Sequence, residues 1–318
     1  MKKLISLAAG ICLAFSLFSC GGKIDTSGWI TSLDDAKKAA SKENKKIFVF
    51  FSEDEGDKRS EKLKTNLFNT KEFIESYTEK YVLVNLDYSE SRFDNNHDGL
   101  QKDMRLFQSY DVPGTPHFLI LSPEGYVISK LAFDDGADID TARITFSEAE
   151  ETIKEFDDLL EKTKKGTKEE KMAAIDEIVD KTDKQVLLHL APLNKLYLSL
   201  DKNNETESYT KHLFLYTNAK ACEQFFANEP EKASEEFVKL SKNKILTDED
   251  KQEALYTAGY LLSIGGSEDL RKILSYFQEA YDIAPESEAA LVLKQYITQI
   301  KMLIDGEGDI PNKQADAE

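Results

Sequence analysis

The sequence predicts an α/β domain, a mixed four-stranded sheet with helices on both faces, followed by an all-α domain. Between residues 47 and 131, four short apolar runs alternate with stretches of helical periodicity, which is typical of buried strands joined by helices. From about residue 147 to residue 304, apolar residues recur with a helical period and no strand pattern intervenes. A chain of 318 residues is also longer than one hydrophobic core usually supports, so two domains are expected.

In the first half the predicted order is helix, strand, helix, strand, helix, strand, strand. Ser32 is a suitable N-cap for a helix that ends near Glu43. Strands are expected at 47–51, 81–87, 117–121 and 126–131, and the helices between them pass through 63–77 and 104–110. Only a turn at 123–125 separates the last two strands, which favours a hairpin. This order predicts a mixed sheet covered on both faces.

In the second half, polar breaks divide the helical pattern into six or seven helices. The breaks lie near 164–166, 201–204, 228–230, 242–244 and 265–266. The whole chain is therefore expected to contain a signal peptide (1–20), a tether (21–28), the α/β domain (29–145), the helical domain (146–304) and a disordered tail (305–318). The tail is assigned because it is rich in glycine, proline and acids.

The first twenty residues have the pattern of an export signal. Lys2 and Lys3 precede an apolar run over 4–18, and the run leads to Cys20 and two glycines. The four residues that end at Cys20 resemble the lipobox of bacterial lipoproteins, whose cysteine is acylated. This resemblance implies a lipid anchor at Cys20 and a folded part in the cell envelope, facing the periplasm or the exterior. An ordinary secretory signal is the alternative.

Composition excludes some classes of function. The formal charge is −18 and no basic stretch occurs, so phosphate-backbone binding has no electrostatic basis and nucleic acid is excluded as a partner. Hydrophobic residues make up 41% and charged residues 31% of the chain, as in a globular protein. Beyond the leader, no apolar run reaches the length of about 20 residues that a membrane-spanning helix needs.

Cysteine usage limits the chemistry further. The three cysteines are Cys12 in the leader, Cys20 at the expected lipidation site and Cys222 in a helical stretch. The processed chain would keep one free thiol and could form no internal disulfide. We interpret Cys222 as a buried small residue rather than a reactive one.

Several motifs in residues 29–133 resemble the thioredoxin-like superfamily. Residues 67–73 match an F-x-x-x-x-F pattern, 84–87 a strand that ends in Asp, and 112–116 the family's loop with a cis proline. Counting forward from the first strand, Asp57 and Ser60 occupy the two positions where relatives carry a cysteine pair. We interpret Asp57 as a helix N-cap. Without that pair the chain cannot form and resolve a mixed disulfide there.

The same resemblance assigns a role to the proline loop. It implies a cis bond at Pro116 and leaves the backbone of Thr115 available to pair with an extended peptide. A purely structural turn is the alternative.

The second half resembles a tetratricopeptide unit. The positions that carry this resemblance are Leu255, Ala258, Gly259, Leu262, Phe277, Ala280 and Pro285, and Ala233 with Phe237 suggests a poorer earlier copy. Small residues let paired helices approach closely, and stacked pairs form concave peptide-binding surfaces. A generic helical bundle is the alternative.

No metal or cofactor site is predicted. The run Asp94–Gly99 fits the first six positions of a calcium loop, but Arg105 stands where the bidentate acid belongs, so a polar loop is favoured. His117, His189 and His212 show no ligand spacing.

These observations predict a non-catalytic, lipid-anchored envelope protein that binds proteins or peptides through a redox-inactive thioredoxin-like domain and a helical repeat-like domain. The alternative is a thiol-redox protein that acts in envelope redox homeostasis through a partner's thiol or Cys222. A third possibility is that the first domain only spaces and stabilises the second.

Overall fold

The computed structural model describes residues 28–53, 55–92 and 97–306. The predicted signal peptide, the lipidation site Cys20, nearly all of the tether, most of the tail and the first half of the Asp94–Gly99 loop lie outside these ranges. Within them, no helix is both long enough and apolar enough to cross a bilayer.

The first half contains one mixed sheet with the strand order β2-β1-β3-β4. Its strands are β1 (Lys46–Ser52), β2 (Tyr81–Asp87), β3 (His117–Leu121) and β4 (Val127–Leu131). β1 pairs with β2 in parallel and with β3 antiparallel, and β4 continues the hairpin from β3 with a bulge near Ile120. The predicted strands and their arrangement are confirmed.

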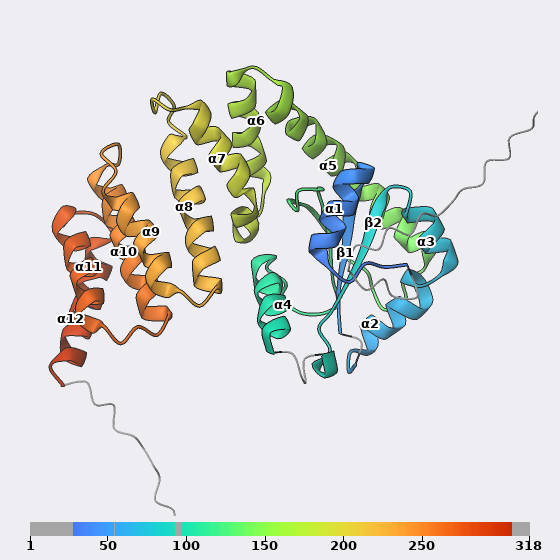
Figure 1. The fold of residues 1–318 in the computed structure, drawn as a ribbon, viewed down its shortest axis with the longest axis horizontal. Coiled ribbons are helices and arrows are strands. Elements are labelled where there is room, and N and C mark those ends of the chain that lie inside the picture. Colours follow the sequence, from blue (N-terminus) through green and yellow to red (C-terminus); the bar gives the residue numbers. More distant parts are fainter. Residues whose placement is uncertain (1–27, 54, 93–96, 307–318) are drawn as a thin grey trace, which may run out of the picture.

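Helices cover both faces of this sheet (Figure 1). They are α1 (Leu33–Glu43), α2 (Lys58–Leu63), α3 (Lys71–Tyr77) and α4 (His97–Ser109), with a π turn η1 (Lys64–Phe68) after α2 and a 3-10 turn η2 (Glu90–Arg92) before α4. β1 supplies apolar side chains to both faces. Phe48 and Phe50 pack in the cluster that contains Phe68 and Phe73, whereas Val49 and Phe51 pack towards α1 and Tyr110. Burial on both sides explains why β1 is a continuous apolar run.

The second half is helical throughout the described residues. It contains α5 (Ile139–Lys165), α6 (Lys168–Lys181), a 3-10 turn η3 (Lys184–Leu190), α7 (Ala191–Leu200), α8 (Tyr209–Phe226), α9 (Pro230–Ser241), α10 (Asp248–Ile264), α11 (Leu270–Ile283) and α12 (Ala290–Ile304). These helices run from the thioredoxin-like half to the opposite end of the molecule (Figure 1).

Two details of the second half differ from the sequence prediction. The described residues hold eight α-helices from α5 onwards rather than six or seven, because the breaks at 182–190 and 284–289 are real helix ends. The first of these breaks contains Val186, Leu187, Leu188 and Leu190, and the second contains Ala284 and Ala289, so neither is an uninterrupted polar run. In addition, α5 begins at Ile139, where Asp138 is the N-cap, and not at about 147.

The two halves share packed surfaces. Phe146 of α5 lies in the same apolar cluster as the aromatic residues of the sheet, so α5 crosses the domain boundary predicted at 145/146 without a break. On the other face of the sheet, η3 contributes Val186 to the cluster that contains α1. The Tyr110 ring stacks on the His189 ring at 3.9 Å. The predicted domain limits remain predictions.

Candidate functional site

The resemblance to thioredoxin-like proteins implies that the start of α2 is the position of their cysteine pair. The loop after β1 leads to Asp57, whose side chain caps α2 by accepting hydrogen bonds from the backbone N–H groups of Arg59 and Ser60, both at 3.0 Å. An N-cap acid satisfies helix N–H groups that have no partner within the helix. Asp57 therefore holds the helix start without sulfur.

Ser60, at the second cysteine position, is fully buried. Its hydroxyl donates to Asp57 Oδ2 at 2.6 Å and accepts from the backbone N–H of Glu53 at 3.3 Å. Ser60 thus links the helix start to the end of β1. The two residues that replace the cysteine pair form a small hydrogen-bonded unit.

The loop before β3 lies beside this unit. The bond between Thr115 and Pro116 is cis, as the resemblance implied. The Thr115 hydroxyl donates to Glu53 Oε2 at 3.5 Å, so Glu53 connects the proline loop to Ser60 through its side chain and its backbone. Among the described residues, no hydrogen bond uses the backbone N–H or C=O of Thr115.

The electrostatics favour a charged carboxylate at the helix start. Partial burial by itself would raise the pKa of Asp57, but the hydrogen bonds from Ser60 and from the backbone N–H groups outweigh this and lower the pKa below its ordinary value. Arg59 contributes in the same direction and also pairs with Asp135 at 2.6 Å. A stably ionised Asp57 is an acceptor and not a proton donor at neutral pH.

The three histidines that showed no ligand spacing in the sequence, His117, His189 and His212, do not gather at the start of α2. His117 follows Pro116, but its ring packs near Phe51 on the α1 side of the sheet, and its Nε2 is buried without a hydrogen-bond partner. Burial, together with Lys130, lowers the pKa of His117 despite the opposing effect of Asp111. Among the described residues, no group of three or more His, Cys, Asp or Glu side chains could hold a metal ion.

Cys222 lies in α8, in the helical half (Figure 1). It is half-buried, and burial raises the pKa of its thiol, which lowers the thiolate fraction that would act as a nucleophile. The sequence predicts that Cys222 is a buried small residue rather than a reactive one; the side chain is only half-buried, and the raised pKa of its thiol is the feature that disfavours reactivity.

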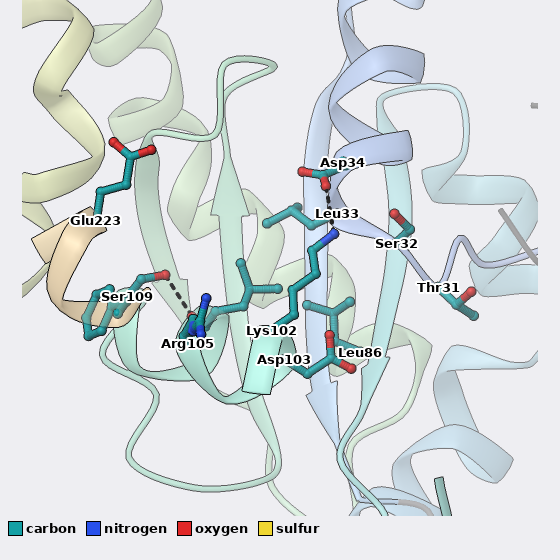
Figure 2. A pocket seen from close by; sticks show the side chains of 12 residues that line it. Thr31, Ser32, Leu33, Asp34, Leu86, Lys102, Asp103, Arg105, Ser109 and Glu223 are labelled. Carbon is teal, nitrogen blue, oxygen red and sulfur yellow. Dashed lines mark hydrogen bonds and ion pairs between the residues drawn. The ribbon is translucent and has the colours of Figure 1, made fainter. Parts of the chain in front are cut away.

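The sequence did not reveal a pocket between the two halves (Figure 2). It has a volume of about 430 Å³ and lies between the start of α1, the face of α4 and the end of α8. Leu33, Leu86 and Phe226 are among its apolar lining residues, and Lys102 bridges to Asp34 at 3.1 Å across its rim. Its size suits a small ligand or apolar side chains of a partner. Only tertiary packing brings these segments together.

Glu53 belongs to the site formed by the start of α2 and the proline loop, and the sequence analysis did not predict it. The sequence places it directly after the first buried strand, but nothing in its local pattern shows that it connects Ser60 to Thr115.

Comparisons with known proteins concern the two halves of the chain separately. Residues 33–132 match the family model described as a thioredoxin-like domain, and this part of the chain is a thioredoxin-like domain by sequence and by sheet topology. Residues 209–305 match a second family model, described as an uncharacterised protein C-terminal domain. Among solved structures, a chain titled DsbH oxidoreductase is similar at 21% identity and a TM-score of 0.34, over 40% of this chain and 83% of that chain. No curated protein matches significantly.

Proposed function

We propose that the chain is a non-catalytic, lipid-anchored protein of the cell envelope that binds other proteins or peptides. The observation that carries this proposal is the pairing of a sulfur-free helix start, held by Asp57 and Ser60, with a proline loop whose Thr115 backbone is unpaired. Thiol exchange needs a thiolate at that helix start, whereas addition of an extended peptide needs only free backbone groups.

The helical half supports the binding part of the proposal. Gly259 of α10 lies so close to Phe277 of α11 that a Cβ on it would be 2.7 Å from the ring. Close approach at a small residue is what the tetratricopeptide resemblance implies, and stacks of such pairs form extended binding surfaces. The anchor at Cys20 would hold this surface near a membrane.

Photocrosslinking tests the binding role. A photoreactive side chain at Thr115, in the full chain in intact cells, is expected to give discrete crosslinked protein or peptide products. The same group at Glu79, an exposed position after α3, is the matched control and should give none of them. Equal crosslinking from both positions would contradict a specific surface at the proline loop.

The catalytic alternative is tested separately. Because residues 33–132 form a thioredoxin-like domain, a thiol-redox reaction that uses Cys222 or a partner's thiol is the competing function. Insulin reduction by the full chain should not exceed that of Cys222→Ala, because the Cys222 thiol is held protonated by burial. Turnover that is lost in Cys222→Ala would favour the redox function.

The anchor has its own test. Metabolic labelling with a fatty acid that carries a chemical tag should label the chain, and Cys20→Ser should abolish the label. Labelling that survives Cys20→Ser would place the lipid elsewhere.

A further inference from the structure

The outer face of α12 is unusually apolar for the end of a helical stack. Leu293, Ile297 and Ile300 are buried against α10 and α11, so the opposite face of α12 meets solvent. That face carries four of the nine large apolar side chains that are exposed in the described residues: Leu291 (68% exposed), Val292 (44%), Met302 (42%) and Leu303 (51%).

The absence of acidic side chains from α12 also distinguishes this face. The terminal helix of a helical repeat normally has a polar outer face, because nothing further packs on it. The other exposed residues of α12 are the uncharged Gln295, Thr298 and Gln299 and the cations Lys294 and Lys301. The helix contains no acid, although the chain has 59 Asp and Glu residues. Desolvating this face therefore removes no carboxylate of α12 from water.

The pattern of the face is symmetric about Ile297. Leu291 and Leu303 lie six positions before and after it, Val292 and Met302 lie five before and after, and Gln295 and Gln299 lie two before and after. Each of these six residues thus has a chemically similar counterpart at the same distance from the centre, whereas the exposed Thr298 is matched by the half-buried Tyr296. An isologous contact about a twofold axis requires such self-complementarity, because residue i meets residue j and residue j meets residue i.

We propose that the α12 face docks on the α12 face of a second copy of this chain, with the two helices antiparallel and a twofold axis near residue 297. In this arrangement Leu291 meets Leu303 of the second copy and Val292 meets its Met302. Gln295 meets Gln299 of the second copy, and these amides can both donate and accept hydrogen bonds. The antiparallel direction also places the positive end of each helix dipole beside the negative end of the other.

A second copy fits this face better than the chain's own C-terminal segment. Residues 307–318 contain one large apolar side chain, Ile310, and four acids, so they offer little to bury.

The small surface area that two α12 helices can bury against each other indicates a reversible contact. A helix of 15 residues is about 22 Å long, and one helix pair of that length lies at the small end of specific interfaces, below about 1,200 Å². Glu288 and Asp305 stand at the two ends of the face, where acids of the two copies would approach each other.

Charge substitutions test both the contact and its direction. Two full-length copies with different affinity tags are co-expressed and purified in detergent through one tag. Wild-type copies should co-purify. Leu303→Glu in both copies should lower co-purification at least about tenfold, because it buries two unpaired carboxylates. Leu291→Lys with Leu303→Glu in the same chain should restore it, since lysine then meets glutamate only if the helices are antiparallel.

The same co-purification assay includes a control substitution on another helix. Ile144→Glu changes a side chain that is 62% exposed on α5 and should leave co-purification unchanged. Circular dichroism should show wild-type melting for each variant, because the substituted side chains are exposed. The proposal fails if wild-type copies do not co-purify, or if Leu303→Glu has no effect. Loss without restoration in the double variant overturns the antiparallel docking.

Other occupants of the face give distinct results. If wild-type copies co-purify only after residues 307–318 are deleted, the tail covers the face and the proposal is wrong. If they do not co-purify, and Leu303→Glu instead weakens binding of a Cys20→Ser chain to phosphatidylglycerol vesicles, the face meets lipid. The peptide-binding role of Thr115 is independent of all these outcomes.

Discussion

At the scale of single residues, Asp57 and Ser60 show how a thioredoxin-like helix start is kept without sulfur. The carboxylate accepts two backbone N–H groups and the Ser60 hydroxyl, and that hydroxyl in turn accepts the Glu53 N–H. The Asp57 carboxylate and the Ser60 hydroxyl therefore both have hydrogen-bond partners, and a buried hydroxyl without one would cost free energy. The arrangement caps the helix and places no thiol at its start.

Removing the cap should cost measurable stability. Asp57→Ala is expected to lower the free energy of unfolding by about 1 kcal/mol at neutral pH, because α2 loses its N-cap. The pKa of Asp57 is lowered in the folded state, so its contribution is present above its ordinary pKa of 3.8 and is lost as the pH falls through the folded value. Urea unfolding at pH 7 and at pH 3 measures both effects.

The matched control for Asp57 is Asp135. Its ion pair with Arg59 is about half exposed, so Asp135→Ala should change stability by well under 1 kcal/mol at either pH. Equal effects of the two substitutions, or an effect of Asp57→Ala that does not shrink in acid, would contradict the capping role.

Installing the missing pair tests the geometry of the site directly. Asp57→Cys with Ser60→Cys places two thiols at the start of α2, beside the cis proline loop. The N-terminus of a helix lowers a thiol pKa, so the double variant should reduce insulin while the wild-type chain does not. Asp57→Ala with Ser60→Cys, which holds one thiol, is the control. An inactive but folded double variant would show that the backbone at this helix start is unsuitable for dithiol exchange.

At the scale of elements, the close pairing of α10 and α11 depends on one glycine. A Cβ on Gly259 would lie 2.7 Å from Cε1 and 2.9 Å from Cδ1 of Phe277, whose ring is buried and cannot move aside freely. Gly259→Ala gains up to about 1 kcal/mol of helix propensity, but overpacking of a well-filled core costs about 1–3 kcal/mol. The packing effect should dominate.

We therefore expect Gly259→Ala to destabilise the helical half by up to about 2 kcal/mol in urea unfolding, the difference between those two effects. Ser263→Ala, on the exposed side of the same helix, is the control and should change stability by less than about 0.5 kcal/mol. Phe277→Leu in the Gly259→Ala background should make the alanine less costly, because it removes ring atoms at the contact. A stabilised Gly259→Ala chain would show that the helices are not held at this distance.

The elements also show where the sequence was informative. β1, β2 and β3 could be predicted because each is a short, almost continuously apolar run, which is typical of a strand buried on both faces. β4 contains Ser129 and the exposed Lys130, and it could be predicted because a turn joins it to β3. The cis bond before Pro116 followed from family resemblance and not from local chemistry. The early start of α5 was missed because residues 139–146 mix β-branched and polar side chains, which gives no clear helical pattern. This first part of α5 is held by tertiary packing, since Phe146 lies in the apolar cluster of the sheet.

Contacts between distant segments were the part that a single sequence could not provide. Glu53 and Thr115 are far apart in the chain, and their hydrogen bond depends on the register of β1 against β3. The pocket in Figure 2 needs α1, α4 and α8 to converge. Neither arrangement leaves a periodic pattern in the residues that form it.

At the scale of the whole molecule, a half-buried histidine contributes to the junction between the two halves. His189 of η3 stacks on Tyr110, and its Nε2 lies 2.8 Å from the Ser109 carbonyl oxygen, so this nitrogen carries the proton and donates. Burial lowers the pKa of His189 to about 4, against the raising effect of the Ser109 hydrogen bond, and Lys37 adds to the lowering. The imidazole is neutral at pH 7, which suits an apolar junction.

This pKa makes the junction sensitive to acid. The folded pKa of about 4 lies below the ordinary value of 6.5, so between these values the unfolded chain binds more protons than the folded one. The contribution of neutral His189 is complete above pH 6.5 and is lost as the pH falls towards 4. At 1.36 kcal/mol per pKa unit, the loss amounts to at most about 3 kcal/mol.

Comparison with His189→Phe isolates this effect from the other titrating groups, because phenylalanine keeps a ring against Tyr110 and cannot be protonated. Free energies of unfolding measured from pH 7.5 to pH 4 should fall more steeply for the wild-type chain than for the variant, with the difference developing below pH 6.5. Since α5 carries the core of the sheet into the helical half, opening of the junction should expose amides in both halves, which hydrogen exchange can detect. Parallel pH profiles of the two chains would mean that His189 is not held neutral at the junction.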